Sequence, residues 1–273
     1  MEKKYIFLKM FELSGRNIIL TGSAGRLGQH FAQILSAAGA NVMLLDTNNK
    51  KNKYLETHLK EKYNTNPRSY TVDISKQSQL KEISKKIMKD YGKIDGLINN
   101  AFYSPLQDKK NAAESFERFS ISIWEEMMRV NLTGIFLITQ EFGKIMVKQK
   151  SGVIVNISSI YGMVGADQRI YGKSKLNSSV AYAASKGSVV NMTRFLAAYW
   201  QGKNIRVNTL TLGGVIDKSY MSEEFVRNYS YKTMLGRMAK PDEYNGALLF
   251  LVSDASSYMT GANLVVDGGW TAW

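Results

Sequence analysis

The chain has 273 residues, 44% of them hydrophobic, with three prolines. No linker, internal repeat or low-complexity segment divides it, so we predict a single domain over residues 1–273. The absence of cysteine excludes disulfides and thiolate metal sites. The net charge of +13 is carried by scattered lysines. Because no basic run alternates with aromatic residues, we expect no nucleic-acid partner and favour an anionic small-molecule substrate.

Targeting and metal-binding signals are weak. The first fifteen residues are basic and partly apolar but lack the apolar core and cleavage site of a signal peptide. No apolar run approaches the roughly 18 residues that span a bilayer, so we expect a cytoplasmic protein with no membrane partner. The two histidines, His30 and His58, lack metal-ligand spacing, and no metal is expected.

Short apolar runs alternate with segments of helical periodicity from residue 17 onward. The runs predict buried strands at 17–21, 41–46, 69–73, 94–100, 152–158, 204–212 and 263–267. The periodic segments predict helices at 28–38, 48–63, 75–91, 121–149, 180–201 and 241–253. This alternation indicates an α/β Rossmann fold, a doubly wound parallel sheet of seven strands covered by helices on both faces. Such sheets bind ligands beyond the carboxyl ends of their strands.

The stretch TGSAGRLG at 21–28 connects the first predicted strand to the first helix. Glycine at Gly22, Gly25 and Gly28 permits a tight turn and a close approach of the backbone to a pyrophosphate. The helix N-terminus then offers unpaired N–H groups and the positive end of its dipole. A glycine triplet alone is weak evidence, but between a strand and a helix it predicts a dinucleotide site.

The residue that ends the second strand favours NAD over NADP. Asp46 is placed to bind the adenosine ribose hydroxyls, and its charge would repel a 2′-phosphate. Arg26 and the lysines at 50–51 argue in the opposite direction. Asp73, which ends the third strand, is a candidate both for capping the next helix and for contacting the adenine.

Together these motifs resemble the short-chain dehydrogenase/reductase family, in its compact single-domain branch, over roughly residues 15–270. The resemblance rests on TGSAGRLG, NNA at 99–101, VNLTG around Asn131, NISS at 156–159, a Tyr-x-x-x-Lys pair, IRVN at 205–208 and TGANLVVDGG at 260–269. It implies an NAD(P)-dependent enzyme that interconverts a carbonyl and a secondary alcohol. The implied cofactor contacts are Gly22, Ser23, Gly25, Arg26, Leu27, Gly28, Asp46, Asp73, Ile74, Asn100, Ala101, Tyr182, Lys186, Gly213 and Val215.

The resemblance also implies a catalytic tetrad of Asn131, Ser159, Tyr182 and Lys186, with Ser158 as the alternative serine. A free tyrosine has a pKa of about 10 and is a poor base near neutrality. A lysine ammonium nearby favours the phenolate and also holds the nicotinamide ribose. The serine would hydrogen-bond the substrate oxygen, and Asn131 would anchor a water on the proton path.

Tyr-x-x-x-Lys occurs twice, as Tyr171 with Lys175 and as Tyr182 with Lys186. The gap from Ser159 favours Tyr171, but the residues after each pair favour Tyr182. AASKGSVVNMTRFLAAYW continues a helix of the family's length, whereas GKSKLNSS is poor helix material. We therefore predict Tyr182 and Lys186 as the catalytic pair, and an insertion at about 162–178.

The insertion is interpreted either as a solvated loop without a role or as a substrate-facing loop. In the second case Arg169, Lys173 and Lys175 would contact an anionic group. Family members form dimers or tetramers through the helices at 121–149 and 180–201, which makes a homo-oligomer the expectation, with Phe195, Tyr199 and Trp200 as interface candidates. The two tryptophans of GGWTAW (268–273) are expected to pack on a neighbouring subunit or on the substrate mouth.

Departures from the family pattern surround the predicted pocket. Phe102 replaces a glycine after NNA and, with Tyr103, would narrow the pocket. Gly213 follows leucine instead of proline, and Asp217 lies near the position where the family often has a nicotinamide-binding threonine. The combination of NNA with an aromatic residue, the insertion and LGGVID resembles family members of bacterial surface-glycan pathways, including those that make nonulosonic acids for flagella. It implies a keto-sugar or nucleotide-sugar substrate. The alternatives are a 3-oxoacyl-(acyl carrier protein) reductase and a catalytically silent NAD-binding regulatory protein.

Overall fold

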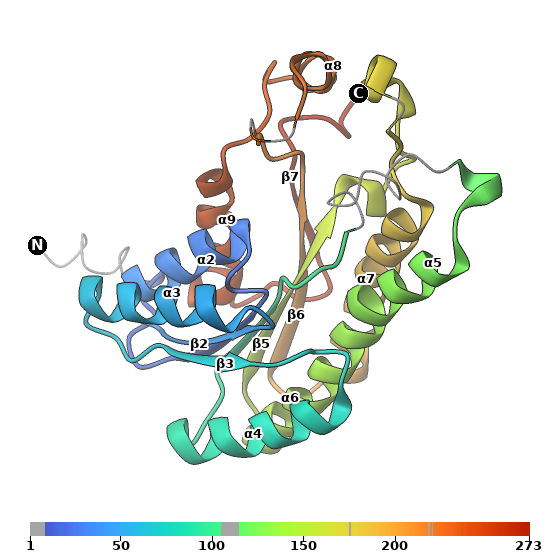
Figure 1. Ribbon diagram of the computed structural model, residues 1–273. Helices are drawn as coiled ribbons and strands as arrows, with labels where there is room; N and C mark the ends of the chain where they lie inside the picture. Colours follow the sequence, from blue (N-terminus) through green and yellow to red (C-terminus); the bar gives the residue numbers. More distant parts are fainter. Residues whose placement is uncertain (1–8, 105–114, 175, 218, 220) are drawn as a thin grey trace, which may run out of the picture.

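The computed structural model describes residues 9–104, 115–174, 176–217, 219 and 221–273, and confirms the predicted fold class. Seven parallel strands form one sheet with the order β3-β2-β1-β4-β5-β6-β7 (Figure 1). Their bounds are β1 Asn17–Thr21, β2 Asn41–Asp46, β3 Arg68–Thr71, β4 Gly96–Asn99, β5 Gly152–Ser159, β6 Ile205–Leu212 and β7 Asn263–Val266. The strand order reverses between β1 and β4, which is the switch point where such sheets bind ligands.

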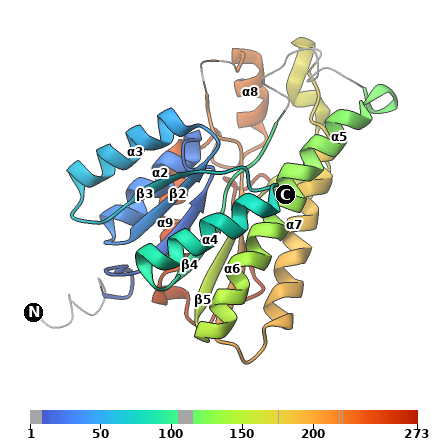
Figure 2. The same cartoon turned by 60° about the horizontal axis from the view of Figure 1, so that its bottom comes forward.

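Helices cover both faces of this sheet (Figures 1 and 2). One face carries α2 Arg26–Ala37, α3 Asn49–Lys62 and α9 Asn245–Val252; the other carries α4 Gln77–Tyr91, α6 Ile135–Gln149 and α7 Val180–Tyr199. The buried side chains accordingly form two large clusters, one around Phe31 and Leu248 and the other around Leu80 and Phe142. Burial on both faces explains why the strands are continuous apolar runs.

The helix predicted at 121–149 is not continuous. It consists of α5 Ile121–Met128, the π-helical segment η4 Arg129–Gly134, and α6. Apolar periodicity continues through the π turn, so the sequence does not reveal the interruption. The helix predicted at 241–253 likewise begins with a 3₁₀ turn, η7 Pro241–Tyr244, followed by α9. Two further 3₁₀ turns are η3 Phe116–Arg118 and η8 Asp254–Ser256.

A third apolar cluster lies beyond the carboxyl ends of the strands, at the top of Figure 1. It brings α8 Glu223–Tyr231, which the sequence reading did not predict, against η5 Ile160–Gly162 and η6 Gln168–Ser174. The C-terminal Trp270 completes the cluster. Among the described residues, no helix is both long and apolar enough to cross a lipid bilayer.

Candidate active site

The predicted Tyr–Lys pair lies in the first turns of α7. The hydroxyl of Ser179 accepts a hydrogen bond from the backbone N–H of Tyr182 and caps the helix. Lys186 follows one turn later and is only 3% exposed, and its ammonium donates to the carbonyl of Ile157 on β5 at 2.9 Å. Burial lowers the pKa of Lys186 to about 8. The helix thus holds a buried cation with its Nζ 5.8 Å from the centre of the Tyr182 ring.

The two serines that end β5 have different surroundings. The hydroxyl of Ser158 is buried and donates to the backbone carbonyl of Lys186 at 3.0 Å. The hydroxyl of Ser159 accepts a hydrogen bond from the backbone N–H of Tyr161 at 3.3 Å. Ser158 therefore ties β5 to α7, while the hydroxyl proton of Ser159 has no acceptor among the contacts found in the described part of the chain.

Asn131 lies inside the π-helical segment and is fully buried. Its amide pairs with the backbone of Tyr103: Oδ1 accepts from the N–H at 2.6 Å, and Nδ2 donates to the carbonyl at 2.9 Å. The side chain thus fixes the backbone that follows β4. π turns of this kind are frequent at functional sites.

Phe102 lies against the Tyr–Lys pair. Its ring centre is 6.4 Å from that of Tyr182, in an edge-on arrangement, and 5.6 Å from the Nζ of Lys186. The ring is 55% exposed. An aromatic wall therefore borders the ring of Tyr182, and the narrowing of the pocket by Phe102 stays a prediction.

The glycine loop has the shape that a pyrophosphate requires. Gly22 has a φ of 64°, and a Cβ on it would lie 2.7 Å from the Cα of Ala101. A Cβ on Gly28 would lie 2.1 Å from the carbonyl oxygen of Gly22. No side chain of the described residues caps α2, whose N-cap is Gly25, so its first N–H groups face the strand ends without a side-chain acceptor. These residues fit a dinucleotide pyrophosphate.

Asp46 is held at the edge of this loop. Its carboxylate accepts hydrogen bonds from the backbone N–H groups of Ala24, at 2.9 Å, and Asn48, at 2.8 Å. Arg26 points elsewhere, since its guanidinium contacts the carboxylate of Asp217 at 2.9 Å. The negative charge at the end of β2 is therefore not neutralised by Arg26.

The other predicted cofactor residues near the loop support its backbone. Ser23 is buried and donates to Asn52 of α3 at 2.6 Å, and Leu27 packs on the apolar cluster beneath α2. The amide of Asn100 donates to the carbonyls of Thr21 and Gly22, at 3.0 Å and 3.1 Å. The N–H of Ala101 donates to the hydroxyl of Thr21 at 3.0 Å.

Asp73 and Ile74 lie beyond the end of β3. Partial burial by itself would raise the pKa of Asp73, but hydrogen bonds from Ser75 and the charge of Arg129 hold that pKa below its usual value. Asp73 therefore stabilises the turn that precedes α4, but it does not cap that helix as expected, since the N-cap is Lys76 and no side chain bonds there. Ile74 is buried and packs closely on Gly134, the last residue of the π-helical segment.

Gly213 and Val215 follow β6. A Cβ on Gly213 would lie 2.8 Å from the Cα of Asp267, so glycine permits close packing with the end of β7. Val215 forms a parallel bridge with Ala239. Both positions therefore belong to a fixed backbone beyond the strand ends, on the opposite side of the switch point from Asp46.

The segment 162–178 packs against α8. Ile170 is buried, and the Tyr171 ring lies 5.3 Å from that of Phe225. Asp167 forms ion pairs with Lys232 at 2.6 Å and with Arg169 at 2.8 Å. The segment is thus anchored to the third apolar cluster. Of the three cations expected to meet an anionic group, Arg169 is held by Asp167, Lys173 is exposed, and Lys175 lies outside the described residues.

The C-terminal tryptophans pack on α8 and on Lys232, the residue that follows it. The ring of Trp270 stacks on that of Tyr229 at 4.3 Å, and the indole N–H of Trp273 donates to the carbonyl of Lys232 at 3.2 Å. A cavity of about 480 Å³ lies between them and the segment. Its lining is Val164, Gly165, Ala166, Asp167, Gln168, Arg169, Lys232, Trp270, Thr271 and Trp273.

Helix α8 contributes residues that the sequence reading missed. The hydroxyl of Tyr229 accepts the backbone N–H of Gly214 and thereby holds the segment after β6. The signal was present, because Ser222 is a good N-cap, two glutamates follow it, and Phe225 and Val226 stand one turn before Tyr229. A helix of this length, with polar residues between its apolar ones, is easily mistaken for loop.

Comparison with known proteins agrees with this geometry. Residues 22–271 match a family model described as enoyl-(acyl carrier protein) reductase. The chain is 31% identical to D-threitol dehydrogenase of Mycolicibacterium smegmatis (96% of this chain, 95% of that protein). It is 34% identical to 3-oxoacyl-[acyl-carrier-protein] reductase of Thermotoga maritima (94% and 98%) and 30% identical to post-translational flagellin modification protein A of Campylobacter coli (94% and 99%).

Solved structures give the same result. A short-chain dehydrogenase from Leptospira borgpetersenii with bound NAD+ aligns with a TM-score of 0.81 at 32% identity (95% of this chain, 94% of that chain). A gluconate 5-dehydrogenase from Burkholderia cenocepacia in complex with NADP and tartrate aligns with a TM-score of 0.86 at 28% identity (98% and 99%). The fold and site define an NAD(P)-dependent oxidoreductase that acts on CH–OH groups. The chain belongs to the short-chain dehydrogenase/reductase family.

Proposed function

We propose that the enzyme interconverts a carbonyl and a secondary alcohol of a sugar, with Tyr182 as proton donor and acceptor. The observation that carries this assignment is the buried ammonium of Lys186, one helical turn from Tyr182 and fixed on the backbone of β5. A cation in this position favours the phenolate form of Tyr182. Ser159, whose hydroxyl proton remains available, hydrogen-bonds the substrate oxygen.

Bound NAD(P) supplies or accepts the hydride at the substrate carbon. In the reducing direction the hydroxyl of Tyr182 gives its proton to the substrate oxygen, and Lys186 holds the nicotinamide ribose and stabilises the phenolate that remains. Asn131 completes the tetrad. Because its amide is committed to Tyr103, we assign the anchoring of a water to its backbone carbonyl within the π turn. The proton is then restored to Tyr182 from solvent.

We infer a preference for NAD over NADP. The carboxylate of Asp46 stands at the end of β2, fixed by two backbone N–H groups, and would repel a 2′-phosphate. Arg26, which would favour NADP if it faced Asp46, is paired with Asp217 instead. The relevant measurement is the ratio of kcat/KM for NADH and NADPH, and a ratio that favours NADPH would contradict the preference.

The proposed substrate class is a keto-sugar or a nucleotide-linked sugar of a surface-glycan pathway. A flagellin modification protein and a threitol dehydrogenase are among the relatives, which supports a polyhydroxylated substrate. The aromatic wall of Phe102 and the anchored segment 162–178 offer surfaces for a sugar ring. The alternative is a 3-oxoacyl-(acyl carrier protein) reductase, which the Thermotoga maritima relative supports.

A panel assay tests these alternatives. NADH absorbance would be followed with keto-sugars, nucleotide keto-sugars and 3-oxoacyl thioesters, each at equal concentration. Turnover confined to the sugars supports the proposal, and preferred turnover of the thioesters supports the alternative. NADH binding without turnover of any of the substrates would support the silent NAD-binding regulatory protein instead.

We also propose that copies of the chain pair through α6 and α7. Phe136 on α6 and Phe195 and Tyr199 on α7 carry exposed rings, the last two stacked at 5.8 Å. Trp200, the third interface candidate, is buried against the core and does not contribute. Light scattering of the wild type and of Phe195→Glu tests the pairing: the substitution should lower the mass, and a wild-type monomer would contradict it.

A further inference from the structure

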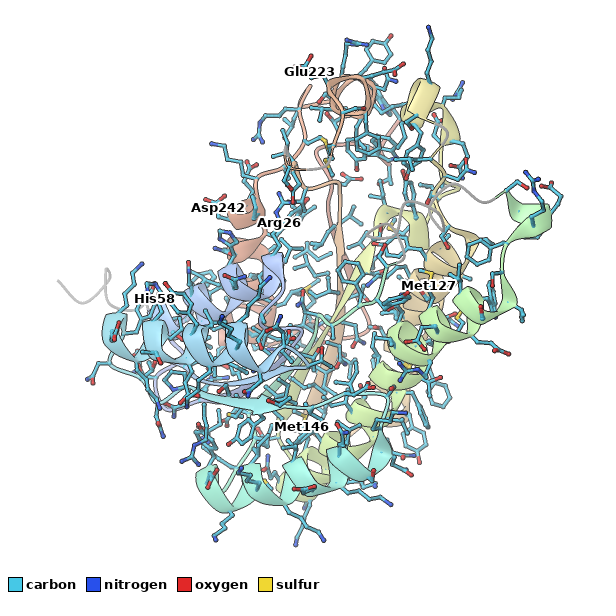
Figure 3. The ribbon with its side chains drawn as sticks, viewed as in Figure 1. Arg26, His58, Met127, Met146, Glu223 and Asp242 are labelled. Carbon is cyan, nitrogen blue, oxygen red and sulfur yellow. The ribbon has the colours of Figure 1, made fainter. Side chains whose placement is uncertain are left out.

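One ion pair connects the two halves of the sheet. Arg26 is the first residue of α2, which follows β1, whereas Asp217 lies in the segment that follows β6. These two strands belong to opposite halves of the sheet. Figure 3 shows Arg26 at the end of α2 that faces the strand ends, below the helix that carries Glu223. A single contact therefore connects the pyrophosphate-binding turn with the segment that leads into α8.

The carboxylate of Asp217 is held in a fixed orientation. Its Oδ1 accepts hydrogen bonds from the hydroxyl and the backbone N–H of Ser219, at 2.6 Å and 3.0 Å. Its Oδ2 faces the guanidinium of Arg26 at 2.9 Å. Hydrogen bonds from Ser219 and, after them, the charge of Arg26 lower the pKa of this carboxyl, so it is charged near neutrality.

Arg26 lies at the end of α2 where a positive charge is unfavourable without a negative charge beside it. The N-terminus of a helix is the positive end of its dipole, so a guanidinium in the first turn is destabilised unless a negative charge lies next to it. Asp217 supplies that charge. A pyrophosphate bound at the same helix end would satisfy both the N–H groups of α2 and the guanidinium, with two charged oxygens available for a forked contact.

We propose that Asp217 is a positioning residue of the cofactor site. It holds Arg26 from the other half of the sheet until a phosphate of the dinucleotide takes its place. Asp217 therefore competes with the cofactor for Arg26. This competition weakens cofactor binding. This rests on the dinucleotide binding of the proposed function but not on the identity of the substrate.

The test is the dissociation constant of NADH, measured by calorimetry on the purified full chain. Removing the competitor in Asp217→Asn should tighten binding about threefold, the size expected for a partly exposed ion pair. Arg26→Gln should weaken binding about tenfold, because a charge-assisted contact to phosphate is lost. In the Arg26→Gln background, Asp217→Asn should have no further effect. Asp217→Glu, which keeps the charge, should restore the wild-type constant.

A matched control separates this competition from a change in net charge. Asp254→Asn removes the same charge from an ion pair with Arg16, which precedes β1 at the amino ends of the strands, and should leave NADH binding unchanged. Asp217→Ser provides a second charge-free variant if Asp217→Asn does not fold. Unchanged or weaker binding in the charge-free variant would overturn the proposal alone. A wild type that does not bind NADH would overturn the proposed function as well.

Discussion

Two segments of the chain contain the same spacing of tyrosine and lysine but differ in backbone. Tyr182 and Lys186 lie in α7, where one helical turn brings their side chains to the same face. Tyr171 is followed by Gly172, whose φ of 53° and ψ of −129° end the helical turn at once. The helical backbone that follows Tyr182 therefore has no counterpart after Tyr171.

Their surroundings differ as well. The ammonium of Lys186 is buried beside Tyr182 and Phe102, at the end of β5. The ring of Tyr171 packs on Phe225 of α8 and anchors the segment 162–178. Burial of Lys186 is the setting that the proposed proton chemistry of Tyr182 needs. The predictions below test that difference, from the largest expected effect to the smallest.

Removal of the tyrosine hydroxyl should give the largest difference in kcat between the two segments. Tyr182→Phe removes the proton donor and should lower kcat by about a thousandfold, within the range of general acid–base catalysis. Tyr171→Phe removes the same hydroxyl from a residue that packs on α8 and should change kcat less than about twofold. Steady-state kinetics with the best substrate of the panel measures both. A larger loss in Tyr171→Phe than in Tyr182→Phe would reverse the assignment.

The burial of Lys186 should be visible in stability as a function of pH. Its pKa is lowered from 10.5 to about 8 in the folded state, so between these values the unfolded chain binds more protons than the folded one. Stability relative to Lys186→Met should therefore rise as the pH increases from about 8 to 10.5, by about 3 kcal/mol in total. Urea unfolding of both proteins across this range measures the difference.

Lys173→Met is the control, since it removes the same charge from an exposed side chain in the other segment. Groups whose pKa does not depend on Lys186 titrate alike in all three proteins and cancel in the comparison. A rise of similar size relative to Lys173→Met would show that burial of Lys186 is not its cause.

The two serines at the end of β5 should separate catalysis from stability. Ser159→Ala should lower kcat about a hundredfold while leaving the free energy of unfolding nearly unchanged. Ser158→Ala removes a buried hydrogen bond to the backbone of Lys186 and should cost about 1 kcal/mol of stability, with a smaller effect on kcat. If Ser158→Ala gives the larger loss of kcat, the alternative serine is the catalytic one.

Much of the fold could be predicted because both faces of the sheet are covered. Burial on both sides makes each strand a continuous apolar run, and β1 and β2 were predicted to the residue. Strand β3 extends from 68 to 71 instead of 69 to 73, because Asp73 turns the chain through its hydrogen bonds to Ser75. The π turn at Asn131 leaves no mark on apolar periodicity, and the sequence therefore indicated one long helix.

The residues of the candidate site that belong to a local sequence motif could be predicted. Contacts between residues far apart in the sequence could not. Tyr182, Lys186 and the glycine loop follow from local patterns. The pairing of Arg26 with Asp217 joins residues on opposite halves of the sheet, so no local pattern indicates it. The packing of the segment 162–178 on α8 is hidden for the same reason.

Phe102 should control which substrates reach Tyr182. Phe102→Gly introduces the residue that the family motif usually has there and opens the space beside the phenol. We expect kcat/KM for the largest substrates of the panel to rise about fivefold relative to the smallest, since one apolar contact changes discrimination by tens of fold at most. Phe225→Leu, at the ring that contacts Tyr171, is the matched control. An equal change in substrate discrimination in Phe225→Leu would show that the effect is not specific to the space beside Tyr182.

The ion pair between Asp167 and Lys232 should have the smallest effect, and it tests whether the segment 162–178 faces the substrate. Both side chains are partly exposed, so the pair contributes little to overall stability. If the segment contacts substrate, Asp167→Asn should raise KM about twofold to threefold without changing kcat, because it loosens a binding surface and not the proton path. Lys232→Met should give an equal or smaller shift, and the double variant no more than Asp167→Asn alone, since Asp167 also pairs with Arg169. An unchanged KM in all three variants would leave the segment 162–178 with a purely structural role. The Tyr171 segment would then serve packing alone, and the Tyr182 segment the proposed chemistry.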